Sequence, residues 1–101
     1  MFGTHSAIGD HVLVRGLTLV AHNCIIGDYV SLGPGVVVGG LAVIESGVYV
    51  GLGARISPNL RIGANSMIAA GAVVTRDVPA NALVAGTPAV VKREGITGYR
   101  G

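Results

Sequence analysis

The chain has 101 residues, of which 50% are apolar and 12% are charged, and its formal net charge is +2. This length fits a single domain, while the sequence contains no run of about 18 apolar residues and no basic N-terminal region leading into an apolar one, so we expect no membrane insertion. Aromatic residues make up 4% and no dense basic run occurs, which argues against a nucleic-acid partner. Cys24 is the single cysteine, so no internal disulfide can form and we expect a soluble cytoplasmic protein.

A hexapeptide repeat runs without a gap from residue 2 to residue 79. Each of its thirteen units begins with a large apolar residue, namely Phe2, Ile8, Val14, Val20, Ile26, Leu32, Val38, Ile44, Val50, Ile56, Ile62, Ile68 and Val74. The second position is glycine in seven units, which we interpret as the backbone freedom that a corner needs. The fifth position is almost always small or β-branched, with Leu60 as the exception. Such a repeat indicates a solenoid.

Strand geometry converts this repeat into a fold. Residues two apart on a strand share a face, so positions five and one point inward and position six points outward. Positions two to four then form a corner, and three sides close a triangular coil of about 18 residues, with successive coils about 4.8 Å apart. The sequence therefore predicts an all-β parallel β-helix over residues 1–79. Residues 80–101 are expected to form a short C-terminal extension with a mobile tail from Gly95.

The outward sixth position is apolar through much of this prism. The residues are Leu13, Leu19, Ile25, Val37, Val43, Tyr49, Met67 and Val73. Flat apolar faces of this size usually mark an interface, so we expect a homo-oligomer. The alternative is that these residues only favour strands.

Charge is distributed unevenly along the chain. Up to residue 50 the only basic residue is Arg15, and six follow beyond it: Arg55, Arg61, Arg76, Lys92, Arg93 and Arg100. A polyanionic cofactor would prefer these C-terminal coils. A solvated end that binds no ligand explains the same charges equally well.

His22 is the leading candidate for chemistry. It occupies position three, on an outward corner, where a histidine can take a proton from an attacking amine or hydroxyl near neutral pH. An ordinary exposed corner histidine is the alternative. Cys24 lies two residues later at the inward position five, so we interpret it as a buried core thiol, not a nucleophile.

The segment from His22 to Tyr29, which reads His-Asn-Cys-Ile-Ile-Gly-Asp-Tyr, resembles the bacterial sugar acetyltransferase branch of the hexapeptide-repeat acyltransferases. This branch includes nucleotide-amino-sugar N-acetyltransferases and sialic acid O-acetyltransferases. Further similarity lies in Ser57-Pro58-Asn59-Leu60, in Ile68-Ala69-Ala70-Gly71-Ala72 and in Val84-Ala85-Gly86-Thr87-Pro88-Ala89. The resemblance implies a single-stranded left-handed β-helix, a cyclic homotrimer, acetyl-CoA as acyl donor and an amino-sugar or sugar acceptor.

The resemblance also implies roles for individual residues. His22 takes the place of the family's general base. Gly40 lies three repeat units later, so it stacks on the same corner one coil up, and it matches the amide that faces the thioester carbonyl. Leu52 and Ala70, which share a column with Pro34 on another corner, match backbone contacts to the pantetheine arm of acetyl-CoA. The phosphates of the cofactor would lie near the basic C-terminal coils and the Lys92-Arg93 pair. Direct acetyl transfer, without an acyl-enzyme, is the expected mechanism.

Two positions depart from the family pattern. Relatives often have an acidic residue after the histidine, and this chain has Asn23, which can hydrogen-bond but supplies no charge. Relatives of the amino-sugar type have a second, cofactor-binding histidine where this chain has Ser31.

Relatives of the amino-sugar type also usually carry a preceding domain that helps to bind the sugar nucleotide, whereas the repeat begins here at residue 2. We therefore expect a fragment, or a minimal protein with another acceptor or none.

Two other functions are alternatives. The γ-class carbonic anhydrases use a similar prism to bind zinc, but the spacing of His5, His11 and His22 does not match theirs, so we expect no metal. A β-helix can also be a non-catalytic scaffold or an ice-binding surface. The regular threonine columns of an ice-binding surface are missing, since Thr4, Thr18 and Thr75 share no face position in series.

Overall fold

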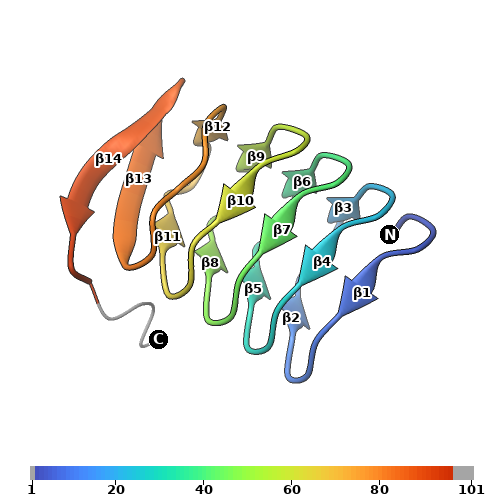
Figure 1. Cartoon of the computed structure of the whole chain (residues 1–101). Helices are drawn as coiled ribbons and strands as arrows, with labels where there is room; N and C mark the ends of the chain where they lie inside the picture. The colour runs from blue at the N-terminus through green and yellow to red at the C-terminus, as the bar shows by residue number, and fades with distance from the viewer. Residues whose placement is uncertain (1, 97–101) are drawn as a thin grey trace.

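The structure is a computed structural model that describes residues 2–96, and these residues form a left-handed parallel β-helix (Figure 1). Twelve two-residue strands follow one another at intervals of six residues: β1 (Ala7–Ile8), β2 (Leu13–Val14), β3 (Leu19–Val20), β4 (Ile25–Ile26), β5 (Ser31–Leu32), β6 (Val37–Val38), β7 (Val43–Ile44), β8 (Tyr49–Val50), β9 (Arg55–Ile56), β10 (Arg61–Ile62), β11 (Met67–Ile68) and β12 (Val73–Val74). Two longer strands close the described chain, β13 (Ala82–Gly86) and β14 (Ala89–Glu94). No described residue belongs to a helix that could span a membrane.

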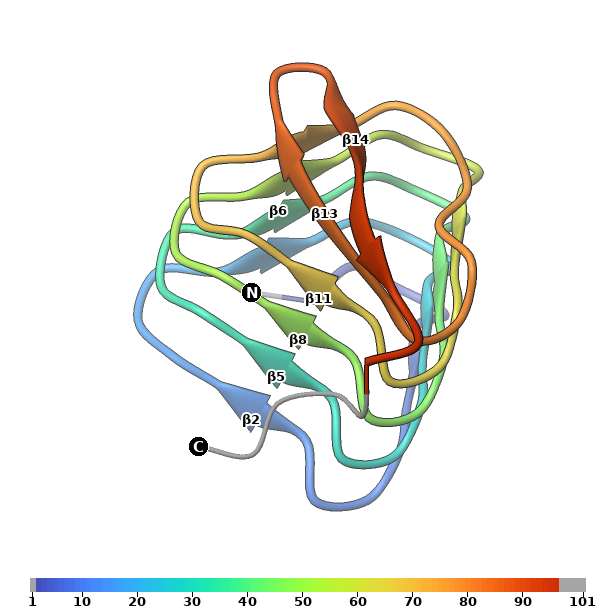
Figure 2. The ribbon, with the colours of Figure 1, turned by 90° about the vertical axis from the view of Figure 1, so that its left-hand side faces the viewer.

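Three sheets form the sides of a triangular prism (Figure 2). We name them sheet A (β3, β6, β9, β12), sheet B (β1, β4, β7, β10) and sheet C (β2, β5, β8, β11, β13, β14). The strands of the regular coils pair in parallel with partners three repeat units away, such as Ile8 with Ile26 and Val20 with Val38. The predicted prism, with three repeat units in each coil, is thereby confirmed.

The core is built from the two inward positions of each unit. Position one contributes large side chains such as Leu32 and Ile44, and position five contributes smaller ones such as Ala42, all with no exposed surface. The polar Ser66 is buried at position five because its hydroxyl donates to the carbonyl oxygen of Gly63 at 2.7 Å. Phe2 is 42% exposed because it lies in the first described coil, with only one neighbouring coil to cover it.

The structural requirement for glycine at position two differs from the one expected. None of the seven has a positive φ. A Cβ there would lie less than 3.0 Å from an atom of the next coil, as at Gly39, where it would be 2.6 Å from the backbone nitrogen of Pro58. The requirement is therefore close stacking of corners and not backbone freedom. Most corners take their positive φ at position four, as at Leu41 with φ 63°.

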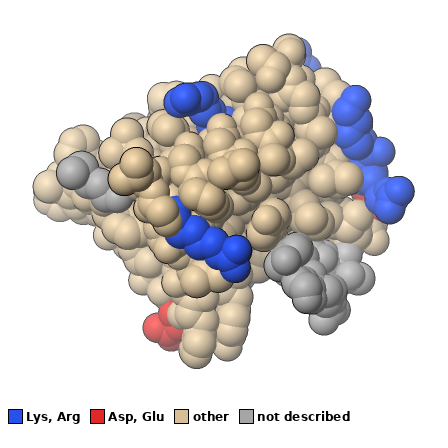
Figure 3. Space-filling view, turned by 180° about the vertical axis from the view of Figure 1, so that it is seen from behind, with Lys and Arg blue, Asp and Glu red and all other residues tan. Residues whose placement is uncertain are grey.

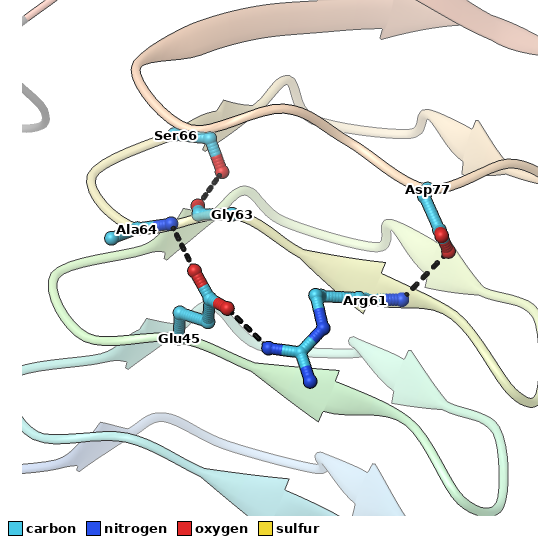
Figure 4. Close-up of polar contacts among 6 residues, drawn as sticks. All are labelled: Glu45, Arg61, Gly63, Ala64, Ser66 and Asp77. Atoms are coloured by element: carbon cyan, nitrogen blue, oxygen red, sulfur yellow. Dashed lines mark hydrogen bonds and ion pairs between the residues drawn. The ribbon is translucent and has the colours of Figure 1, made fainter.

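The coil shortens at the C-terminal end. Ile62 pairs with Val78 and Met67 pairs with Leu83, so each partner comes two positions earlier than the regular period requires. The shortened corner gives Arg61 a side-chain acceptor, because its amide donates to a carboxylate oxygen of Asp77 at 2.8 Å (Figure 4). The regular period thus ends before residue 79, and the expected mobile tail lies mainly in residues 97–101, outside the described part of the chain.

A polar contact ties neighbouring coils together on sheet B. The guanidinium of Arg61 forms an ion pair with Glu45, and the other carboxylate oxygen of Glu45 accepts the amide hydrogen of Ala64 at 3.0 Å (Figure 4). The Arg61 side chain is 61% exposed, so water screens this pair and we assign it little stability.

Candidate functional site

His22 and Gly40 stack on the corner between sheets A and B, which we call the histidine corner. The amide of Leu41 donates to the carbonyl oxygen of His22 at 3.1 Å, and the amide of Asn59 donates to that of Gly40 at 2.9 Å. This ladder of backbone hydrogen bonds sets the two residues one coil apart, about 4.8 Å along the prism. The predicted stacking of Gly40 on His22 is confirmed.

Packing within the chain does not explain the glycine at position 40. Its φ is not positive, and a Cβ built there would meet a single atom within 4 Å beyond its chain neighbours, the carbonyl oxygen of His22 at 3.5 Å, an ordinary contact. The N–H of Gly40 also donates to no acceptor among the described residues. The corner therefore has a backbone donor without an intramolecular acceptor, at a residue with no side chain of its own, which suits a close approach by a ligand.

The ring of His22 is exposed and is held from the coil below. The amide of Thr4 donates to Nδ1 of His22 at 2.9 Å, and the Thr4 hydroxyl oxygen lies 2.9 Å from the same nitrogen. A ring nitrogen that accepts an N–H bond carries no hydrogen, so the neutral ring in this arrangement holds its proton on Nε2. Nε2 is then the donor of this exposed ring, and the hydrogen-bond contacts of the ring with described residues are both at Nδ1.

The residues beside His22 do not hold its ring. Asn23 has a φ of 60°, and its amide donates to the carbonyl oxygen of Thr4 at 3.0 Å. In the described part of the chain, no carboxylate hydrogen-bonds the His22 ring. Cys24 is fully buried, with its sulfur 3.2 Å from the carbonyl oxygen of Gly39, as its inward position predicted.

A second column lies on the corner between sheets C and A, which we call the leucine corner. The amide of Gly53 donates to the carbonyl oxygen of Pro34 at 2.9 Å, and the amide of Gly71 donates to that of Leu52 at 2.8 Å. Pro34, Leu52 and Ala70 thus stack in the predicted column. Leu52 is 59% exposed, so this corner presents an apolar surface.

The two columns lie on different corners of one chain, separated by sheet A. Six residues connect neighbouring corners, a span of at most about 20 Å. Sheet A therefore lies between the His22–Gly40 column and the Leu52–Ala70 column of the same chain. Ser31 lies on neither corner, because it is a half-buried residue of β5 in sheet C, between Leu13 and Tyr49.

Basic side chains form separate groups on a largely uncharged surface (Figure 3). Lys92 and Arg93 lie on β14, the strand at the C-terminal end of the prism. The end also holds a cleft of about 340 Å³, between residues 74–78 and residues 88–91, with Arg76 in its lining. Sequence reasoning missed this cleft because it lies beside the shortened last coil, and no sequence motif predicts that shortening.

Of the other two histidines, His5 follows Thr4 on the histidine corner, one coil below Asn23, and His11 lies apart from the site. His11 lies on the third corner, between sheets B and C, where its ring stacks on Tyr29 with centroids 4.8 Å apart. Among residues 2–96, no group of three His, Cys, Asp or Glu side chains lies close enough together to hold a metal ion.

Known proteins share this architecture. GDP-perosamine N-acetyltransferase from Caulobacter crescentus, solved as a histidine-to-alanine mutant with CoA and GDP-perosamine, is 33% identical over 92% of this chain, with a TM-score of 0.90. Serine acetyltransferase from Brucella abortus strain S19, in complex with coenzyme A, is 34% identical over 91% of the chain, with a TM-score of 0.81. A hexapeptide-repeat acetyltransferase from Vibrio cholerae O1 biovar eltor, complexed with acetyl-CoA, is 30% identical over 92%, with a TM-score of 0.83.

This chain spans 44%, 41% and 64% of the lengths of these three proteins. Comparison with curated protein sequences finds no match. The model of the bacterial transferase hexapeptide (six repeats) matches residues 5–40 and 41–76, which together make up most of the prism. The chain therefore belongs to the bacterial hexapeptide-repeat transferase family.

Proposed function

We propose that the chain is an acetyl-CoA-dependent acetyltransferase that moves an acetyl group directly to an amine or hydroxyl of a small sugar-type acceptor. The main support is the stack of His22 under Gly40, where an exposed imidazole lies one coil from an amide donor that packing leaves open. Three similar proteins are acetyltransferases solved with CoA or acetyl-CoA. The sugar-type acceptor is supported by GDP-perosamine in the most similar of the three folds.

The proposed reaction needs two groups of the chain. In the tautomer with its proton on Nδ1, His22 takes a proton through Nε2 from the acceptor nitrogen or oxygen as that atom attacks the thioester carbonyl, and the N–H of Gly40 donates to the developing oxyanion. The tetrahedral intermediate then collapses, the carbon–sulfur bond breaks, and the CoA thiolate leaves. The proton on His22 passes to the thiolate or to solvent. Cys24 takes no part because it is buried.

A homotrimer would complete the site. We propose that the leucine corner of one copy lies against the histidine corner of the next. Rotation about an axis parallel to the prism leaves heights unchanged, so Leu52 of the second copy would lie about 3 Å above Gly40 of the first, and Ala70 about 8 Å above it. A pantetheine arm would then run from the acetyl group toward the C-terminal coils. Ser31 of the second copy would lie slightly below the level of Gly40, where its hydroxyl can hydrogen-bond the cofactor.

Exposed apolar residues support this contact between copies. Leu41 lies on the histidine corner and is 56% exposed, whereas Leu17 and Leu52 lie on the leucine corner and are 92% and 59% exposed. The proposed contact would bring these exposed apolar side chains of two copies together and remove them from water. The phosphates of the cofactor would then meet basic groups of the C-terminal coils, such as Arg76 in the cleft lining.

The decisive experiment measures binding and transfer separately. We would titrate acetyl-CoA by calorimetry and then follow release of CoA thiol with amino sugars, sialic acids, simple amines and L-serine as acceptors. His22→Ala should still bind acetyl-CoA but lower transfer by at least about 100-fold. His11→Ala, on the third corner, is the matched control and should keep full activity. Unchanged transfer in His22→Ala would refute the base assignment, and failure of the wild type to bind CoA would favour a non-catalytic scaffold.

A further inference from the structure

Thr4 is the residue that contacts the ring of His22. In the described part of the chain, it makes both of the hydrogen-bond contacts of that ring, one through its amide and one through its hydroxyl, each at 2.9 Å from Nδ1. Thr4 lies three repeat units before His22, one coil below it on the histidine corner. No sequence motif singles it out.

A base of the proposed kind needs such a partner. For Nε2 of a neutral histidine to accept a proton, Nδ1 must already carry one, and Nδ1–H needs an acceptor to hold the ring in place. Asn23 occupies the position of the acidic residue expected after the histidine, yet it makes its contact with Thr4 through its backbone amide and not with the His22 ring. Among residues 2–96, the Thr4 hydroxyl oxygen is the acceptor at hydrogen-bond distance from Nδ1.

The two groups of Thr4 favour different tautomers of His22. The amide can only donate, so it stabilises the form with the proton on Nε2. The hydroxyl can also accept, so it suits the form with the proton on Nδ1. The amides of His22 and Gly40, at the same corner position in the next two coils, donate to no described residue. An amide in this position is therefore stable without a protein partner. Moving the hydrogen bond of the Thr4 amide from Nδ1 to water thus costs little free energy.

We propose that Thr4 is the positioning residue of His22, with its amide holding the ring at rest and its hydroxyl accepting Nδ1–H in the tautomer that acts as base. This proposal rests on the proposed acetyltransferase function. The exchange of tautomers is balanced, because solvent takes the proton from Nε2 and returns one to Nδ1. Nε2 then accepts the proton of the attacking group, and the imidazolium keeps its bond to Thr4. The hydroxyl thereby replaces an orienting carboxylate without adding charge.

Kinetics of two variants test the role of the hydroxyl. Thr4→Ser keeps the hydroxyl and Thr4→Ala removes it, while both keep the amide. We expect Thr4→Ser to retain kcat within about twofold and Thr4→Ala to lose about 3- to 10-fold in kcat with an unchanged KM for acetyl-CoA. A wild-type kcat in Thr4→Ala, or an equal loss in Thr4→Ser, would overturn the proposal.

Nuclear magnetic resonance tests the contact without any need for activity. In ¹⁵N-labelled protein, the Thr4 amide nitrogen should show scalar coupling to Nδ1 of His22 through the hydrogen bond. Thr4→Pro removes the donor and should abolish the coupling; proline already occupies this corner position at Pro34 and Pro58, so the backbone accepts it. Acetyl transfer by a wild-type protein that lacks the scalar coupling would overturn this inference alone. A wild-type protein that shows the coupling but transfers no acetyl group would refute the proposed function and, with it, the role of Thr4 in catalysis.

Discussion

Gly40 lies directly above His22, and beyond residues 39–41 the carbonyl oxygen of His22 is the one described atom within 4 Å of the place where a Cβ of residue 40 would stand. The adjacent Gly39 is the opposite case, since its Cβ would lie 2.6 Å from the backbone nitrogen of Pro58. The two neighbouring positions are thus glycine for different structural reasons. Gly39 is required by the stacking of coils, whereas packing does not require a glycine at position 40, which agrees with the proposed approach of a ligand there.

These two glycines provide a matched pair of variants. Gly40→Ala should keep the thermal midpoint of unfolding within about 2 °C of the wild type, because its Cβ makes an ordinary contact, and should lower acetyl transfer about tenfold or more by crowding the amide. Gly39→Ala should lower the free energy of unfolding by about 2 kcal/mol or more, because backbone atoms must move. Thermal unfolding and thiol release measure both effects. Equal stability losses in the two variants would contradict the distinction.

The proposed contact between copies predicts a change of assembly when Leu52 becomes charged. Leu52→Glu should fold, because the side chain is 59% exposed, but it should shift the protein from trimer to monomer and weaken acetyl-CoA binding at least tenfold. Light scattering at micromolar concentration reports the mass. Tyr29→Ser, at a 65% exposed side chain on the third corner, is the control and should remain trimeric. A stable wild-type monomer would exclude the proposed site between copies.

The proposed direct transfer, without an acyl-enzyme, predicts that Cys24 is dispensable for chemistry. Cys24→Ala should keep kcat within about threefold, although removal of the buried sulfur should lower the free energy of unfolding by about 1 kcal/mol. Mass spectrometry after incubation with acetyl-CoA should find no acetyl group on Cys24. An acetylated cysteine, or loss of transfer in the folded variant, would show that the thiol takes part.

Asp77 should stabilise the shortened last coil. Its carboxylate accepts the amide hydrogen of Arg61 at 2.8 Å, so Asp77→Ala should lower the free energy of unfolding by about 1 kcal/mol, whereas Asp77→Asn keeps an acceptor oxygen and should lose less than half of that. Urea unfolding of the two variants measures the difference. Equal stability of all three proteins would mean that water replaces the carboxylate at no loss.

The sequence by itself determined the prism, its inward positions, and the stacking of His22 under Gly40 and of Leu52 under Ala70. This is possible because each coil contacts only its neighbours, so a regular period in the chain becomes a regular rise in space. The six-residue period also predicted that Cys24 lies in the core and that His22 lies on an exposed corner, as the structure confirms.

Only the tertiary structure decided the features that depend on atomic approach between coils. The glycines at position two are explained by contacts of less than 3.0 Å with the next coil, which no single repeat contains. The shortening of the last coil follows from how its corner closes with Asp77. The partner of His22 also emerged only in three dimensions, because hydrogen-bond direction and side-chain rotamer determine that Thr4, and not the adjacent Asn23, contacts the ring.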